Sequence, residues 1–332
     1  MSDRLVITPA ELGTIGVKTV QQLHDSRDRL MPILLPGMDG YFMPLEPGSL
    51  TIVQAQTSNG KSWFMRRWME RMVKFLKWNN RNEILVWIDT EITADYIAMS
   101  NVMRQSGTSY DQIVSPTGGI HMQSLMKAAA DIAGIPVYTI ATRLGNDGSE
   151  VHLSNIRKGL SMLQDGRVDG EKHVIAGVFV DYLQSLPVDP VVQRSPLENQ
   201  RRLQVARDVD QCRIMGAKFG APVVLGVQAK QTLEPSEASR KLGLPGMYDG
   251  QETANIAQRA DRIISLSVAA RNFGKGQTLD YHGQSFTVTD GLMFARVLKQ
   301  RGDDLPSGAV FAYQMHRASD PMDALVNLWS ES

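Results

Sequence analysis

The stretch Ala55-Gln-Thr-Ser-Asn-Gly60-Lys61-Ser62 decides the fold of this chain. It follows Leu50–Val53, a run of residues typical of a buried strand, and it precedes Trp63–Trp78, whose apolar residues recur at helical spacing. A tight loop between a strand and a helix can bind phosphate, because backbone N–H groups of the loop and of the helix start converge on one position. The sequence therefore predicts a phosphate-binding loop here.

The residues of this loop have separate predicted roles. Lys61 adds positive charge beside the phosphates, and the Ser62 hydroxyl is suited to binding Mg²⁺. The usual pattern is G-x-x-x-x-G-K-[ST], and here Ala55 takes the first glycine's place. ATP and Mg²⁺ are the expected ligands. The residues predicted to contact the nucleotide are Ser58, Asn59, Gly60, Lys61 and Ser62.

Two further apolar runs end in carboxylates. Ile175–Val180 is followed by Asp181, which we expect to support the Mg²⁺ ion. Leu85–Ile88 is followed by Asp89 and Glu91, and ATP hydrolysis needs a group that orients or deprotonates the attacking water. Strand alternation places Asp89 and Glu91 on the same side, so spacing alone leaves both as candidates.

Two later strands end in other polar groups. Gln228 follows the apolar run that starts at Pro222, and its amide could sense the γ-phosphate by hydrogen bonding. Lys299 and Arg301 follow another apolar run, and cations can stabilise the charge that develops during phosphoryl transfer. Surface charge would account for such a pair equally well.

Apolar runs alternate with helical segments along most of the chain, which predicts an α/β fold with a mostly parallel sheet and helices on both faces. Residues 270–289 and 301–307 are rich in Gly, Asp and Lys and are predicted to form a hairpin or loops. The remaining predicted strands are 137–140, 263–268 and 292–297, and the remaining predicted helices are 94–103, 154–163 and 201–219.

Composition limits the other possibilities. The 332 residues include 35 basic and 35 acidic ones, so nucleic-acid binding would need a local basic patch. The only cysteine, Cys212, excludes an internal disulfide and is expected to be buried on a helix. The sequence has neither a signal-peptide pattern nor a stretch of membrane-spanning length, which favours a soluble, cytoplasmic protein. We expect residues 1–36 to form an arm helix, over 17–30, with a linker, and residues 37–332 to form one ATPase domain.

Taken together, these elements resemble the ATPase domain of DnaB-type replicative helicases, which are RecA-like motors. The resemblance runs from about residue 37 to 311. It depends on motifs that include Ala-x-x-Ser-x-Gly-Lys-Ser from Ala55, Asp181-Tyr-Leu-Gln184, and Lys299-Gln-Arg301. It implies a hexameric ring, or an open helical form of it, that moves along single-stranded DNA.

The resemblance also implies roles for individual residues. Glu91 is favoured over Asp89, because Trp87-Ile-Asp-Thr-Glu91 is similar to the strand of RecA recombinases that carries the catalytic glutamate. Gln228 would be the sensor. Lys299 and Arg301 match the pair that family members insert into the neighbouring subunit's site.

Two departures from the family pattern bear on function. The DNA-facing loop of these helicases typically carries Arg-Glu-Ser-Gly, whereas this chain has Gln251-Glu252-Thr253-Ala254, so an amide replaces the phosphate-contacting arginine. We still expect Gln251, Glu252 and Ala254 to form the nucleic-acid loop. The helical N-terminal collar domain on which replicative helicases bind primase is also not expected in this chain.

Three hypotheses about function follow. The first is an ATP-driven translocase on single-stranded DNA, encoded by a bacterium, phage or plasmid, with a primase or loader as a possible partner. The second is a RecA-like ATPase that regulates or loads a protein partner without unwinding. In the third, the nucleotide is only a structural part of a binding ring. Glu91 argues against the third, and the altered loop at 251–254 favours the second over a simple motor.

Overall fold

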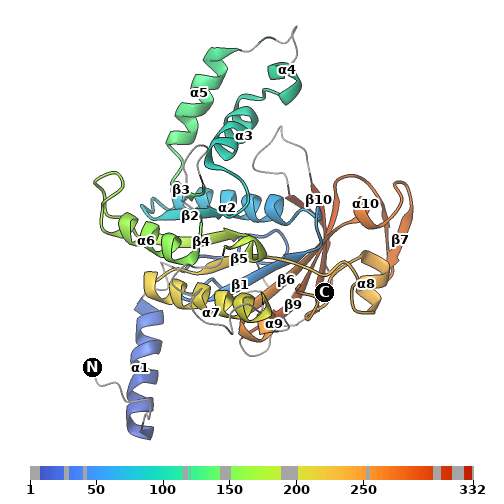
Figure 1. Cartoon of the computed structure of the whole chain (residues 1–332). Coiled ribbons are helices and arrows are strands. Elements are labelled where there is room, and N and C mark those ends of the chain that lie inside the picture. The colour runs from blue at the N-terminus through green and yellow to red at the C-terminus, as the bar shows by residue number, and fades with distance from the viewer. Residues whose placement is uncertain are drawn as a thin grey trace.

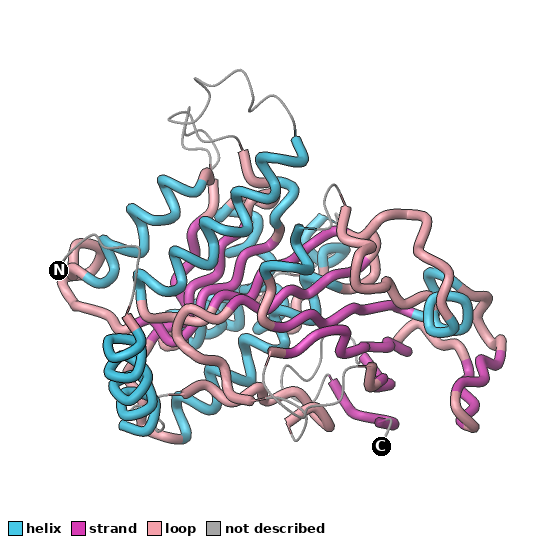
Figure 2. Tube along the Cα trace, turned by 90° about the horizontal axis from the view of Figure 1, so that it is seen from below, coloured by secondary structure: helices cyan, strands magenta, loops and turns pink. Residues whose placement is uncertain are grey.

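The computed structural model describes residues 8–25, 30–39, 43–114, 119, 121–142, 151–187, 201–251, 255–301, 308–315 and 325–330. Within them, nine strands form one sheet in the order β11-β10-β9-β6-β1-β5-β4-β2-β3 (Figures 1 and 2). From β6 to β3 every pair is parallel, whereas β9, β10 and β11 pair antiparallel. The predicted mostly parallel sheet is thus confirmed, with an antiparallel extension on one side. The strands are β1 (Leu50–Ala55), β2 (Ile84–Asp89), β3 (Val137–Ile140), β4 (Ile175–Asp181), β5 (Val223–Gln228), β6 (Arg262–Val268), β9 (Leu292–Gln300), β10 (Val310–Met315) and β11 (Leu325–Ser330).

Helices cover both faces of the parallel part (Figure 1). On one face, α2 (Lys61–Trp78) buries Trp68 edge-on against Phe179 of β4, with ring centroids 6.0 Å apart. On the other face, α6 (Leu153–Gln164) and α7 (Arg201–Phe219) pack their apolar residues against β1, β4 and β5. Cys212 lies fully buried on α7, as predicted. Continuous apolar strands are the form that a sheet covered on both faces requires.

A helical excursion separates β2 from β3. It contains α3 (Ala94–Ser106), α4 (Tyr110–Val114) and α5 (Met122–Ala133), and α3 packs against α5. In Figure 1 these helices project away from the sheet. Thr93 caps α3 by accepting a hydrogen bond from the Tyr96 amide, and Gly107, with φ of 71°, ends it in the left-handed conformation.

The C-terminal third adds a small separate core beside the sheet. The short helix α10 (Ala269–Asn272) leads into an antiparallel hairpin of β7 (Thr278–Tyr281) and β8 (Gln284–Thr287), which confirms the hairpin predicted over 270–289. The hairpin packs with α8 (Glu237–Leu242) against β9 and β10. Of two shorter elements, η2 (Leu183–Ser185) follows the end of β4, and α9 (Asn255–Arg259) precedes the start of β6.

The N-terminal helix α1 spans Pro9–Asp25, so it begins earlier than the predicted residue 17, and residues 26–29 of the predicted helix lie outside the described residues. Figure 1 shows that α1 projects away from the sheet and its covering helices. Its described side chains are all exposed, including the apolar Leu12 and Val20. Met31 and Leu35, by contrast, are buried in the main core. No helix in the described part of the chain is long and apolar enough to cross a membrane.

Candidate functional site

The predicted phosphate loop connects β1 to α2 in a conformation that needs glycine. Gly60 has φ of 79°, and a Cβ atom there would lie 2.6 Å from the Met293 methyl group of β9. Ser58 also has a positive φ, of 63°. Asn59 is buried, and its Oδ1 accepts a hydrogen bond of 2.9 Å from the Val268 amide of β6. The loop therefore packs against β6 and β9.

Helix α2 begins at Lys61 without a side-chain cap, so the N–H groups of its first turn are available to an anion. The Lys61 Nζ donates to Asp181 Oδ1 at 2.7 Å and lies 4.0 Å from the centroid of the Tyr182 ring. Burial lowers the pKa of Lys61 below its ordinary value, while the charges of Asp181, Glu91 and Asp89 oppose that shift. The loop lysine and the predicted metal-supporting aspartate are thus in direct contact.

The two candidate carboxylates after β2 differ in their surroundings. Asp89 is buried, its Oδ1 accepts from the amides of Glu91 (3.2 Å) and Ile92 (2.8 Å), and its Oδ2 accepts from Trp87 Nε1 at 3.2 Å. Arg66 lies 3.5 Å from the same Oδ2. The Glu91 side chain is exposed and makes no hydrogen bond among the described residues. Because β2 ends at Asp89, the expected strand alternation does not extend to Glu91. Asp89 holds the turn through these hydrogen bonds, whereas the Glu91 carboxylate is open to solvent.

Thr90, to which the sequence assigned no role, joins the ends of β2 and β4. Its hydroxyl accepts from the Tyr182 amide at 3.1 Å and donates to the Asp181 carbonyl, and its own amide donates to the same carbonyl at 3.0 Å. This contact fixes Asp181 relative to the Glu91 turn.

The donor set of Ser62 and Asp181 fits magnesium. A hydroxyl and a carboxylate are hard oxygen ligands, and Mg²⁺ is typically held by one or two carboxylates together with phosphate oxygens and water. Among the described residues there is no cluster of three or more His, Cys, Asp or Glu side chains that would favour a different metal. Ser62 and Asp181 would hold the ion.

Gln228 ends β5 directly beside the phosphate loop, since it pairs with Ala55 in the sheet register. Its Nε2 donates to Thr57 Oγ1 at 2.6 Å. Gln184, after the β4 strand, accepts from the Gln228 amide at 2.9 Å through Oε1 and donates through Nε2 to the Gln228 carbonyl and, at 3.4 Å, to the Gln251 carbonyl. The Gln251 amide donates to the Gln228 carbonyl at 2.8 Å. The sequence motif contains Gln184, but its partners could not be foreseen from spacing.

The predicted nucleic-acid loop is described only at Gln251. Glu252 and Ala254 lie outside the described residues.

Lys299 and Arg301 lie at the other edge of the sheet. Strand β9 runs antiparallel to β6, so Met293 pairs with Val268 beside the phosphate loop, while Gln300 pairs with Arg262 at the far end. Lys299 Nζ donates to the Ala257 carbonyl at 2.7 Å, and Arg301 pairs with Asp261 at 3.0 Å. A strand rises about 3.3 Å per residue, so the six-residue length of β1 places these cations about 20 Å from the loop of their own chain.

This geometry defines a P-loop ATPase with a RecA-like fold. The chain matches the family model "DnaB-like helicase C terminal domain" over residues 32–301 and belongs to that family. Among solved structures, "ATPase Domain of G40P" is similar with a TM-score of 0.68 and 15% identity, covering 95% of this chain and 98% of that one. "The Structure Of A DnaB-Like Replicative Helicase And Its Interactions With Primase" has a TM-score of 0.65 and 16% identity, covering 99% of this chain and 68% of that one. Comparison with curated protein sequences found no match.

Proposed function

We propose that this protein is an ATP-hydrolysing motor that assembles as a hexameric ring, or an open helical form of it, and translocates on single-stranded DNA. The observation that carries the proposal is the contact between Lys61 and Asp181 behind a loop built for phosphate. Membership of the helicase family gives the class of activity. The motor function, the Mg²⁺·ATP ligand and the assembly are inferences from this arrangement.

When bound, Mg²⁺·ATP supplies the phosphoryl group that water attacks. On nucleotide binding, the Lys61 side chain would exchange its contact with Asp181 for phosphate oxygens, and the Asp181 carboxylate would then be able to hold Mg²⁺. Ser62 would supply a second oxygen ligand. Glu91, whose carboxylate has no competing hydrogen bond among the described residues, orients the attacking water and accepts its proton.

The site is proposed to be completed by a second subunit. Lys299 and Arg301 lie at the opposite sheet edge and cannot serve the loop of their own chain without rebuilding β9. In a ring, that edge of one subunit faces the phosphate loop of the next, and the two cations stabilise the transition-state charge. The exposed apolar residues of α1, such as Leu12 and Val20, are suited to packing on a neighbour.

The coupling to DNA is proposed to run through Gln228. A change at the γ-phosphate would move its side chain, and the Gln184 bridge would carry that change to Gln251 at the start of the nucleic-acid loop. A primase or a loader is the possible protein partner. This partner comes from the similar structure, whose title describes interactions of a DnaB-like helicase with primase.

One observation favours a second candidate, a regulatory or loader ATPase that acts on a protein without unwinding. The sequence from Gln251 to Ala254 contains no cation to contact a DNA phosphate. One experiment separates the two functions. The ATP turnover of an oligomer whose size is fixed by light scattering is measured with and without single-stranded DNA. A motor on DNA is stimulated severalfold, whereas a partner-directed ATPase is not, and a protein without turnover under both conditions would contradict both.

A further inference from the structure

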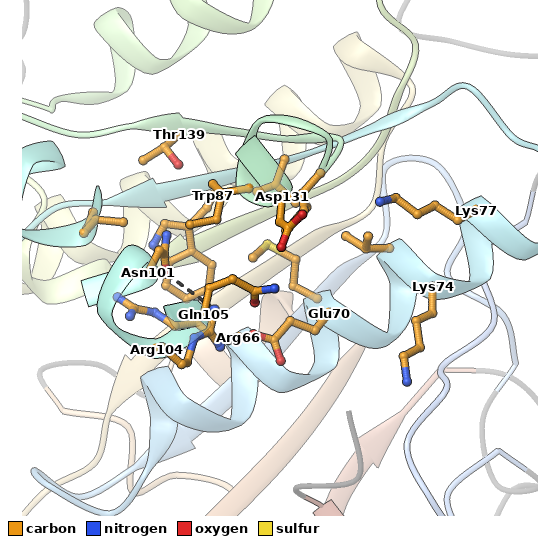
Figure 3. Close-up of a pocket in the computed structure, with 16 residues that line it drawn as sticks. Arg66, Glu70, Lys74, Lys77, Trp87, Asn101, Arg104, Gln105, Asp131 and Thr139 are labelled. Atoms are coloured by element: carbon orange, nitrogen blue, oxygen red, sulfur yellow. Dashed lines mark hydrogen bonds and ion pairs between the residues drawn. The ribbon is translucent and has the colours of Figure 1, made fainter. Parts of the chain in front are cut away.

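A pocket of about 560 Å³ lies behind the nucleotide site, between α2 and the excursion of α3 and α5. Figure 3 shows charged side chains of α2 and α3 around it, with Trp87 of β2 among the lining residues. A volume of this size suits a small organic ligand. The pocket is distinct from the phosphate loop, because none of its lining residues belongs to the loop at 55–62.

The lining combines apolar walls with an excess of positive charge. Val73, Ile97 and Ile135 contribute apolar surface, and the ionisable lining residues are four cations and two acids. One of the acids, Glu70, is already paired with Arg67 and Arg104. Lys74 and Lys77 make no ion pair among the described residues, so their charges are available to a ligand.

Two lining residues connect this pocket to the candidate catalytic turn. Arg66 lies 3.5 Å from Asp89 Oδ2, and its guanidinium lies 5.1 Å from the centroid of the Trp87 ring. Trp87 Nε1 donates to the same Oδ2. Asp89 in turn holds the amide of Glu91. These contacts engage Arg66 with Asp89, so the cations left for a ligand are Lys74 and Lys77, which lie eight and eleven residues, or about 12 and 17 Å, further along α2.

We propose that this pocket binds an organic anion with an apolar body. The apolar part of the ligand lies on Val73 and Trp87, and its carboxylate or phosphate lies near Lys74 and Lys77. Binding of this anion does not depend on the proposed ATPase function.

Binding is tested with two fluorescent probes that share an aromatic body, anilinonaphthalene sulfonate and the uncharged phenylnaphthylamine. The sulfonate should bind and should lose at least about tenfold in affinity in the double variant Lys74→Glu/Lys77→Glu, because two attractive charges become repulsive. Lys172→Glu, an exposed charge reversal before β4, is the matched control and should bind as the parent does. Val73→Trp fills the pocket and should weaken both probes. Equal affinity of the sulfonate for the double variant and the control, or tighter binding of the uncharged probe to the parent, would overturn the site.

Discussion

Cationic side chains lie at both edges of the central sheet, but their surroundings differ. The carboxyl edge is where the parallel strands end, and the amino edge is where they begin. At the carboxyl edge, Lys61 is paired with Asp181 and surrounded by groups that complete a phosphate site. At the amino edge, Lys299 and Arg301 contact only backbone carbonyls and Asp261 among the described residues. Burial lowers the pKa of both lysines, and Arg301 adds to the shift at Lys299. Among the described residues, this cation pair therefore has no contact with the phosphate loop of its own chain.

Under the proposed ring, this difference means that one chain would hold two halves of different sites. An edge that is to bind phosphates needs pre-formed contacts, which the loop and the ends of β2 and β4 provide. An edge that is to deliver charge to a neighbour needs only a rigid strand, which β9 provides through its pairing with β6 and β10. The predictions below test this division.

The largest effect is expected for Arg301→Ala. A cation supplied by a neighbouring subunit contributes about 10³–10⁵ in turnover for related phosphoryl transfers. The variant should therefore lose turnover almost completely while each subunit still binds ATP. Steady-state turnover and the affinity for a fluorescent ATP analogue are the two measurements. If the variant lost turnover and ATP affinity to the same extent, Arg301 would belong to the ATP-binding half of the site.

Mixing two inactive variants tests whether Arg301 acts in the site of the neighbouring subunit. Arg301→Ala subunits retain an intact phosphate loop, and Lys61→Ala subunits, inactive alone because charge and phosphate geometry are lost, retain the cation pair. Mixed oligomers should regain part of the turnover at junctions where both halves are intact. If co-assembly is verified and no activity returns, or if the protein is strictly monomeric with ATP and single-stranded DNA present, the shared site is refuted.

The second effect separates the two carboxylates at the end of β2. Glu91→Gln should bind Mg²⁺·ATP nearly as the parent does and hydrolyse it at least about a hundredfold more slowly, because its contribution is made in the transition state. Asp89→Asn should instead lower thermal stability, since a buried acceptor of several hydrogen bonds is altered. Single-turnover hydrolysis and melting temperature are measured for both. The reverse assignment would follow if Asp89→Asn alone blocked hydrolysis.

Much of the carboxyl edge could be predicted from the sequence, because its signals are local. A strand, a glycine-containing loop and a helix follow one another within Leu50–Trp78, and short-range periodicity is enough to recognise them. The position of Asp181 follows from the same rule, since the ends of parallel strands meet at one edge.

The rest of the fold and of the candidate site depends on contacts between residues that are far apart in the sequence. Gln184 meets Gln228 and Gln251 across 44 and 67 positions of the chain, and nothing in its immediate sequence marks those partners. The edge on which Lys299 lies depends on β9 running antiparallel to β6, yet β9 is as apolar as the parallel strands. The start of α1 was also predicted wrongly, since a helix with exposed apolar residues has no core to fix its register.

The third effect concerns communication from the nucleotide edge to the loop at Gln251. Gln184→Ala removes three hydrogen bonds that join β4, β5 and that loop. We expect basal turnover to stay within about threefold of the parent, whereas stimulation by single-stranded DNA falls by about tenfold or more, because the bridge acts after the chemistry. Gln184→Glu, which keeps the acceptor, is the matched control and should retain more of the stimulation. Equal stimulation in the parent and the alanine variant would show that the coupling takes another route.

The smallest effect of a substitution is expected in a second cluster of polar residues at the amino edge, beside the starts of β3 and β4. Tyr138 donates to Asp169, and His173 Nε2 lies 2.9 Å from the same carboxylate. The hydrogen bond to Asp169 raises the pKa of Tyr138 to about 12, and the hydrogen bonds from Tyr138 and His173 lower the pKa of Asp169 to about 2. This cluster joins the turn before β4 to β3, so we assign it to stability alone.

Tyr138→Phe should therefore leave ATP turnover unchanged and lower the urea midpoint slightly, in contrast to Arg301→Ala. The pH dependence follows from the lowered pKa of Asp169, because the unfolded chain takes up this proton more readily than the folded chain. The contribution of the carboxylate is fully present above its ordinary pKa of 3.8 and is lost as pH falls through about 2. The difference in urea midpoint between Tyr138→Phe and the parent should thus be constant between neutral pH and about 5, and should shrink below 3.8. A difference that persists undiminished in acid would mean that the tyrosine stabilises through packing, and a loss of turnover would show that the amino edge acts in catalysis beyond its two cations.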